Sequence, residues 1–266
     1  MHHLDALENK SIYLIREAHS RFKKKALLWS MGKDSTALLW LCRKAFFGNI
    51  PFPVIHIDTS YKFKEIYNFR KKYSRQWKLN LIISRNEKAL KEGMNHRLGR
   101  SECCNQLKTE TLKMIITENG LQAALLAIRR DEHGIRAKER FFSPRNIDQH
   151  WDYQNQMPEL WDLYKSEKSR TQHFRVHPML HWSELDVWEY IKCEKIPLLS
   201  LYLAKKGQRY RSIGCETCCS PAQSNADSIP KIIKELKTTS TSERSGRAQD
   251  KEDAHTMQKL RSLGYM

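Results

Sequence analysis

The chain has 266 residues, 40% of them apolar, and this length accommodates one sizeable hydrophobic core with a small appended subdomain. No apolar stretch is long enough to span a bilayer and no apolar leader opens the chain, so we expect a cytoplasmic protein without a membrane partner. The net charge of +17 exceeds what a site for one nucleotide requires and favours contact with a polyanion such as nucleic acid. Seven cysteines in that compartment indicate metal ligation or redox chemistry rather than disulfide bonds.

Apolar runs alternate with helical patterns along the chain. The apolar runs predict strands at residues 26–30, 54–58, 79–84, 123–128 and 174–178. Helical spacing predicts helices at residues 33–47, 64–78, 106–119 and 183–194, and Ser183 with Asp186 resembles an N-terminal capping pattern for the last of them. This alternation predicts an α/β fold with a mainly parallel sheet flanked by helices.

The later part of the chain changes in character. Residues 143–172 are polar and punctuated by Trp and Pro, which predicts a long functional loop. From about residue 199 the sequence is basic and loop-rich, with two further helices predicted at 229–237 and 251–263 and a Ser/Thr/Arg-rich stretch at 238–247 that we expect to be mobile. We therefore divide the chain into a main domain, residues 1–198, and a C-terminal helical and loop extension, residues 199–266.

The first chemical motif reads Ser-Met-Gly-Lys-Asp-Ser at residues 30–35, between an apolar run and a helical pattern. Such a strand, tight loop and helix point backbone N–H groups and the positive end of a helix dipole at an anion, and Lys33 adds a point charge. The loop is too short for the Gly-x-x-x-x-Gly-Lys-Ser/Thr loop that grips ATP for attack at the γ-phosphate. An ordinary strand-to-helix turn is the competing interpretation. The candidate nucleotide-binding residues are Ser30, Gly32, Lys33, Asp34 and Ser35.

Two further polar motifs follow predicted strands, at the edge where ligands of open α/β sheets bind. Asp58 and Thr59 end the second strand and are placed to help orient Mg²⁺ or nucleotide, although an Asp at that point also caps helices. A basic motif follows the fourth strand, and arginines there bind phosphate or sulfate through paired N–H donors. A salt-bridged helix face is the alternative, because some of these residues are four apart. The candidates for the substrate anion are Arg129, Arg130, Arg136 and Arg140.

Four segments, residues 30–35, 52–63, 129–140 and 182–191, together resemble the PAPS reductase-like family of PP-loop ATP pyrophosphatases. Within it the chain is most similar to the branch of bacterial sulfate adenylyltransferase small subunits, whose tail residues 239–246 also match, and the resemblance runs from about residue 10 to the C-terminus. The family's loop usually reads Ser-Gly-Gly-Lys-Asp-Ser. Met31 replaces the first glycine, which we expect to be tolerated if that position does not need a positive φ.

The resemblance implies an adenine-nucleotide α-hydrolase-like (Rossmann-like) fold and the use of ATP with Mg²⁺. The implied chemistry is attack of an oxyanion on the α-phosphorus of ATP, which gives an adenylated product and pyrophosphate. It assigns catalytic roles to Lys33, Asp34, Asp58, Arg129 and Arg130. For the sulfate adenylyltransferase branch, the implied partner is a GTPase large subunit.

The cysteines depart from that branch, which normally lacks them. The pair Cys103 and Cys104, with Cys215 and Cys218 in a distant C-x-x-C, resembles the [4Fe–4S] ligand set of adenylylsulfate reductases. Zn²⁺ is the alternative ligand, and unligated thiols are the third reading. Those reductases also carry a catalytic cysteine in a C-terminal Glu-Cys-Gly-Leu-His motif, whereas no cysteine follows Cys219 here, so we do not expect reductase activity.

A third branch combines an adenylating site with cluster cysteines and a basic chain: the ATP pyrophosphatases of DNA phosphorothioate modification. By this resemblance the main hypothesis is adenylation of a DNA backbone phosphate for sulfur insertion, with DNA and a cysteine desulfurase or another sulfur-transfer protein as partners. The alternatives are the sulfate adenylyltransferase small subunit and an APS/PAPS reductase-like enzyme of sulfate assimilation. A nucleotide-binding scaffold that recruits a desulfurase, and a homo-oligomer, also stay open.

Overall fold

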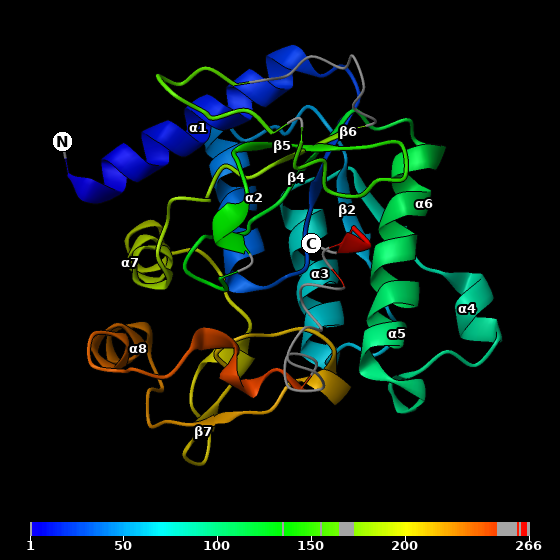
Figure 1. Ribbon diagram of the computed structural model, residues 1–266. Coiled ribbons are helices and arrows are strands. Elements are labelled where there is room, and N and C mark those ends of the chain that lie inside the picture. The colour runs from blue at the N-terminus through cyan, green and yellow to red at the C-terminus, as the bar shows by residue number, and fades with distance from the viewer. Residues whose placement is uncertain are drawn as a thin grey trace.

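A six-stranded sheet forms the centre of the molecule (Figure 1). The structure is a computed structural model that describes residues 2–134, 136–154, 156–164, 173–248, 260 and 262–264. The strand order is β3-β2-β1-β4-β6-β5, and every pairing is parallel except that of β5 with β6. The strands are β1 Lys25–Leu28, β2 Val54–Ile57, β3 Leu81–Ser84, β4 Ala123–Leu125, β5 Phe142–Arg145 and β6 His173–Val176. The predicted α/β class and mainly parallel sheet are confirmed.

Helices cover both faces of this sheet. They are α1 His3–Arg21, α2 Lys33–Ala45, α3 Lys64–Gln76, α4 Glu87–Lys91, α5 Arg100–Cys104, α6 Thr111–Glu118, α7 Glu184–Glu194 and α8 Ile229–Leu236. The predicted cap of α7 is present, because Ser183 and Asp186 form a reciprocal capping box. Within the described part of the chain, no helix has the length and apolarity needed to cross a bilayer.

The alternating side chains of the strands build two apolar layers. In β1, Leu27 faces a large core that includes side chains of α1, α2, α3 and α7, whereas Ala26 and Leu28 face a smaller core with α6. Figure 1 shows α6 on one side of the sheet and α1, α2 and α7 on the other. Burial on both faces explains why the central strands read as continuous apolar runs in the sequence.

Three elements differ from the prediction. Helix α1 was not predicted, because charged residues mask the spacing of its buried Leu7, Leu14 and Ala18. Strand β5 lies within the stretch that we predicted as a loop, and it includes Pro144, which a sheet tolerates at an edge because the missing N–H costs no ladder bond. The helix predicted at 106–119 instead begins at Arg100 as α5 and passes through a π-helical stretch, Asn105–Glu110, into α6.

The C-terminal extension also differs from expectation. Residues 238–247, predicted to be mobile, form a turn, Glu243–Gly246, in which Glu243 and Arg244 are buried. Most of the helix predicted at 251–263 falls outside the described residues. A two-stranded ribbon, β7 Gln208–Arg209 with β8 Ala222–Gln223, and α8 complete the described extension.

The strand order reverses direction around β1 and β4, which are neighbours in the sheet. The chain leaves β1 into the loop 30–32 and leaves β4 into residues 127–131, so the two segments open side by side at the carboxyl edge. Ligands of open α/β sheets bind at such a switch point. The topology therefore brings the first and third motifs to one place.

Candidate active site

The loop after β1 is closed by hydrogen bonds between its own serines. The Ser30 N–H donates to Ser35 Oγ at 3.2 Å, the two hydroxyl oxygens lie 3.0 Å apart, and Ser35 Oγ donates to the Gly32 carbonyl at 3.1 Å. Gly32 is the N-cap of α2, and a Cβ there would meet Ser30 Oγ at 3.4 Å and the Tyr202 hydroxyl at 3.5 Å. The serines thus shape the loop, and the glycine keeps its inner surface open.

Met31 corrects one expectation. Its φ is 63°, so the position does adopt the left-handed conformation that the family's usual glycine accommodates without cost. Its side chain is buried in the large core. A non-glycine residue in this conformation costs about 1–2 kcal/mol, and burial of the Met31 side chain offsets that cost.

Lys33 begins α2 and is buried among charges. Its Nζ lies 3.0 Å from Asp34 Oδ2 and also pairs with Glu243. Burial lowers the pKa of Lys33, but the carboxylates of Asp34 and Glu243 outweigh it and hold the pKa above its ordinary value. The backbone N–H of Lys33 donates to the Tyr202 hydroxyl at 2.9 Å. Lys33 is therefore a fixed positive charge at the helix start.

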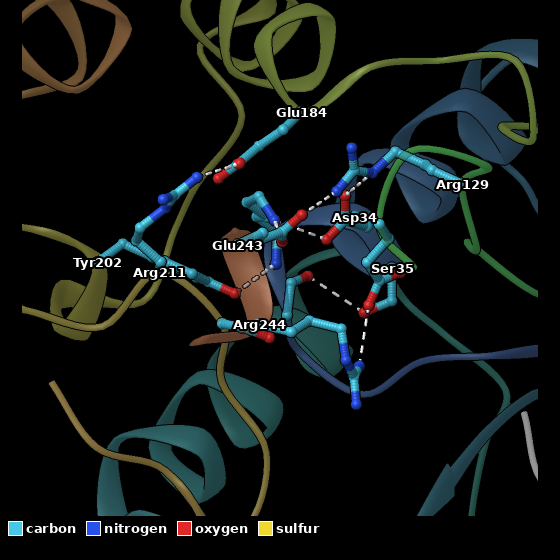
Figure 2. A network of polar contacts seen from close by, with 12 residues as sticks. Asp34, Ser35, Arg129, Glu184, Tyr202, Arg211, Glu243 and Arg244 are labelled. Atoms are coloured by element: carbon cyan, nitrogen blue, oxygen red, sulfur yellow. Dashed lines mark hydrogen bonds and ion pairs between the residues drawn. The ribbon is translucent and has the colours of Figure 1, made fainter. Parts of the chain in front are cut away.

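Arg129 links the third motif to the loop. Its Nε lies 2.8 Å from Asp34 Oδ1, its Nη1 lies 2.6 Å from Asp131 Oδ1, and its Nη2 pairs with Glu243. Figure 2 shows Asp34, Arg129 and Glu243 as one network beside Ser35. The two carboxylates that pair with Lys33, those of Asp34 and Glu243, thus also pair with Arg129.

A second layer of ion pairs surrounds this network. Glu132 accepts from Arg244 Nη1 at 3.0 Å and also pairs with Arg136. Burial raises the pKa of Glu132, but the two guanidinium groups outweigh it and hold the pKa well below its usual range. Arg211 Nη2 lies 2.7 Å from Glu184 at the start of α7, as Figure 2 shows. The site is thus a network of alternating charges from five separate segments of the chain, residues 33–34, 129–136, 184, 211 and 243–244.

A cavity opens beside the loop. Its apolar wall comes from the strand ends, with Leu28, Ile55, Ile57, Leu126 and Ile128. Its polar wall combines the loop with basic side chains, namely Ser30, Gly32, Asp34, Ser35, Lys62, Lys108, Arg136, Arg244 and Arg247. The lining also includes the carboxylate of Glu132, but basic side chains outnumber acidic ones, so the pocket suits a ligand that has an apolar ring and several negative charges.

Asp58 follows β2 next to the loop after β1, since Leu28 pairs with Ile55, but it does not line this cavity. It is buried at the end of β2, where Arg70 Nη1 lies 3.0 Å and Arg85 Nη2 2.9 Å from Oδ2, and the Ser60 N–H donates to Oδ1 at 2.9 Å. Burial would raise the pKa of Asp58, but the Ser60 N–H and the two arginines hold it well below its usual range. Thr59 Oγ1 contacts Cys215 Sγ at 3.1 Å, so it faces the cysteines and not the loop.

The four candidate arginines separate into two pairs. Arg129 lies in the loop network and Arg136 lines the cavity. The guanidinium of Arg130 instead lies over the Phe141 ring, 5.3 Å from its centroid, and neither Arg130 nor Arg140 lines the cavity. Of the four, Arg136 lines this cavity and Arg129 contacts the loop through Asp34, whereas Arg130 and Arg140 do neither.

The four candidate cluster cysteines come together. Cys103 and Cys104 are buried in α5. Burial raises the pKa of Cys103, and the neighbouring thiols of Cys104, Cys215 and Cys218 raise it further, whereas Lys108 lowers it. An isolated antiparallel β-bridge joins the backbone of Cys215, in the C-x-x-C loop, to that of Lys62. No three His, Cys, Asp or Glu side chains in the described ranges converge closely enough to share a single metal ion.

Sequence reasoning missed several residues of the site. Tyr202 contacts the loop from 169 positions away and Glu243 contacts Lys33 from 210 positions away, so no local spacing connects them. Arg211, Arg244 and Arg247 were likewise not singled out. The only signal for Glu243 and Arg244 was the match of residues 239–246 to the family's tail.

The loop, the cavity and the fold define a PP-loop type of nucleotide-binding protein. The model of the phosphoadenosine phosphosulfate reductase domain matches residues 24–221. The chain is 38% identical over 294 aligned residues to the sulfate adenylyltransferase subunit 2 of Psychromonas ingrahamii, with 99% of this chain and 97% of that protein covered. The corresponding protein of Stutzerimonas stutzeri is also 38% identical, with 99% and 98% covered.

Solved structures agree on the fold. The PAPS reductase of Candida auris superposes with a TM-score of 0.56 at 18% identity, covering 83% of this chain and 96% of that one. The FMN adenylyltransferase of Candida glabrata, in complex with ATP, has a TM-score of 0.58 at 17% identity, covering 82% and 63%. The chain belongs to the phosphoadenosine phosphosulfate reductase domain family, and it is an adenylyl-transferring enzyme of the PP-loop type.

Proposed function

We propose that the protein is the small, adenylating subunit of a sulfate adenylyltransferase, which joins sulfate to the adenylyl group of ATP and releases pyrophosphate. The observation that carries the proposal is the 38% identity over 99% of the chain to proteins named sulfate adenylyltransferase subunit 2. The site supports it, since both the loop and the arginines Arg136, Arg244 and Arg247 line the cavity. These relatives are named as a second subunit, which further supports a partner, and we propose that it is a GTPase large subunit.

The proposed reaction balances as one displacement. A sulfate oxygen attacks the α-phosphorus, the new P–O bond forms, and the bond from that phosphorus to the β-bridging oxygen breaks with its electron pair going to pyrophosphate. Lys33, fixed at the start of α2, stabilises the charge that develops on pyrophosphate, and Ser30 and Ser35 hold the loop's shape. Arg136, which lines the cavity, is placed to hold sulfate by paired N–H donors.

The cavity fits ATP with Mg²⁺. Ile55, Ile57 and Leu126 offer an apolar wall for the adenine ring, and the loop at the start of α2 lines the cavity where the helix dipole favours phosphates. Asp34 lines the cavity, and its carboxylate is the group in the loop that would hold Mg²⁺. The metal would neutralise charge on the leaving pyrophosphate.

We also propose that Cys103, Cys104, Cys215 and Cys218 hold a [4Fe–4S] cluster. The four thiols are buried and lie near one another, and their two pairs resemble the ligand set of a [4Fe–4S] cluster; Zn²⁺ is the alternative. Such a cluster would tie the C-x-x-C loop to α5 beside the cavity. Protein purified without oxygen should be brown and contain about four irons per chain. Cys215→Ser should lose the iron, whereas the control Cys193→Ser, at an exposed site, should keep it; a colourless protein with stoichiometric zinc would refute the cluster.

A DNA backbone phosphate is the second candidate acceptor, favoured by this same gathering of cysteines, which the resemblance ties to phosphorothioate modification, and by the net charge of +17. A cysteine desulfurase would then supply sulfur. DNA binding through several phosphates would fall steeply with salt, with a log–log slope of about −0.9 for each duplex phosphate neutralised.

One experiment separates the two acceptors. Pyrophosphate release from MgATP is measured with sulfate, single-stranded DNA or duplex DNA as the only addition. The proposal predicts stimulation by sulfate and none by either DNA. Stimulation by DNA alone would replace sulfate with a nucleic-acid phosphate as the acceptor.

A further inference from the structure

The anion position at the loop is already occupied by a carboxylate of this chain. Glu243 places Oε1 on Lys33 Nζ and Oε2 on Arg129 Nη2, so one carboxylate bridges both cations (Figure 2). Two oxygens of a phosphate group would bridge an ammonium and a guanidinium in the same manner. Glu243 therefore has the charge and the span of a bound phosphate.

The two cations and this carboxylate are buried together, behind the wall of the cavity. The side chains of Lys33 and Arg129 are 1% and 0% exposed, and that of Glu243 is 6% exposed. The cavity reaches the loop through Gly32, Asp34 and Ser35, and neither Lys33 nor Arg129 is part of its wall. The Lys33 ammonium is buried against Asp34 and Glu243, so direct contact with a polyphosphate requires one of these carboxylates to move.

The turn that carries Glu243 is attached by polar contacts. The Ser220 N–H donates to the Gly246 carbonyl at 2.9 Å, Arg211 Nη1 donates to the Thr241 carbonyl at 2.6 Å, and Arg244 pairs with Glu132. Residues 238–248 contain no side chain larger than alanine that is apolar. The segment has no buried apolar anchors, so its attachment depends on these polar contacts and ion pairs, and a ligand with several negative charges competes directly for the two cations.

We propose that Glu243 is an internal stand-in for the polyphosphate: it occupies the site between Lys33 and Arg129 in the empty enzyme, and MgATP or pyrophosphate displaces it together with the turn Glu243–Gly246. This inference rests on the proposed function, because the displacing ligand is a polyphosphate. The apparent dissociation constant then exceeds the intrinsic one by the inverse of the fraction of molecules in which Glu243 has withdrawn. Binding of the nucleotide and opening of the turn become one coupled step.

Calorimetric titration of inorganic pyrophosphate with Mg²⁺ into the full chain tests this. Glu243→Gln removes the competing charge at nearly constant shape and should bind pyrophosphate at least about tenfold more tightly than the wild type. The control is Glu235→Gln. Glu235 lies on α8, and its carboxylate pairs with Arg209 at 2.6 Å, so this variant should bind pyrophosphate as the wild type does. Equal or weaker binding by Glu243→Gln would overturn the proposal and show that the carboxylate positions the cations. If the wild type binds neither pyrophosphate nor ATP, the proposed function fails and the displacement fails with it.

Hydrogen–deuterium exchange gives a second test that needs no variant. The Ser245 N–H donates to the Ser242 carbonyl at 3.2 Å and the Arg247 N–H to the Arg244 carbonyl at 2.8 Å, so the turn protects its own amides. Saturating pyrophosphate with Mg²⁺ should speed exchange in residues 241–248. Unchanged or slower exchange there, with pyrophosphate bound, would refute displacement of the turn.

Discussion

Replacing Lys33 by methionine isolates the contribution of its charge. Methionine keeps most of the buried stem, and both partners of the ammonium, Asp34 and Glu243, retain Arg129 as a counterion. Neither carboxylate is left alone, so the loss of folding free energy should stay below the roughly 3–5 kcal/mol that an uncompensated buried charge costs. The effect on catalysis should be large, because removing one preorganised charge raises the transition-state free energy by about 2.7–4 kcal/mol and lowers the rate by about 10²–10³.

The assay is pyrophosphate release from MgATP, with thermal unfolding recorded on the same preparation. The matched control is Lys44→Met, near the C-terminal end of α2 and outside the site. The Lys44 ammonium lies 2.6 Å from Glu8 and 2.9 Å from Glu194. Lys44→Met should retain full activity. A folded Lys33→Met protein that works within a factor of about ten of the wild type would refute the assignment of Lys33 to the leaving group.

Tyr202→Phe leaves the Lys33 N–H without its hydroxyl acceptor and should lower the free energy of unfolding by about 1–3 kcal/mol, measured by urea denaturation; an unchanged midpoint would contradict the contact. Gly246→Ala would bring a Cβ within 2.5 Å of the Ser220 carbonyl oxygen and should cost about 1–3 kcal/mol in the same assay, and wild-type stability would show that the turn does not pack so closely. Burial lowers the pKa of His177 to about 4, so below pH about 6.5 the unfolded chain binds the proton first and stability falls as pH falls toward 4. His177→Gln should flatten this slope by about 2–3 kcal/mol between pH 6.5 and 4.5, and an unchanged slope would exclude His177 as its source.

Local patterns were sufficient where one segment carries the whole signal. The loop at residues 30–35 shows its own strand, turn and helix, and the topology that places Arg129 beside it follows from parallel strands whose carboxyl ends share one edge. The two cysteine pairs were likewise visible as spacings. In each of these cases the chemistry is carried by residues that are close in sequence.

Contacts across long separations were beyond such reasoning. Asp58 stands at a strand end as predicted, yet Arg70 from α3 and Arg85 after β3 decide its role, and nothing in its own segment announces them. The polar composition of residues 238–247 predicts a mobile stretch. Glu243 is instead paired with two buried cations, Lys33 and Arg129, which lie 210 and 114 positions away in the sequence. Charge pairing of this kind stabilises a segment that has no apolar anchors, and composition alone does not reveal it.

The oxygen atoms of the products test the central claim most directly. MgATP is incubated with sulfate labelled with ¹⁸O, and the phosphorus products are analysed by ³¹P nuclear magnetic resonance and mass spectrometry. The account predicts pyrophosphate without label and an adenylyl product that carries one sulfate-derived ¹⁸O on its phosphorus. ADP with inorganic phosphate, or AMP without label when sulfate is the only acceptor, would contradict it.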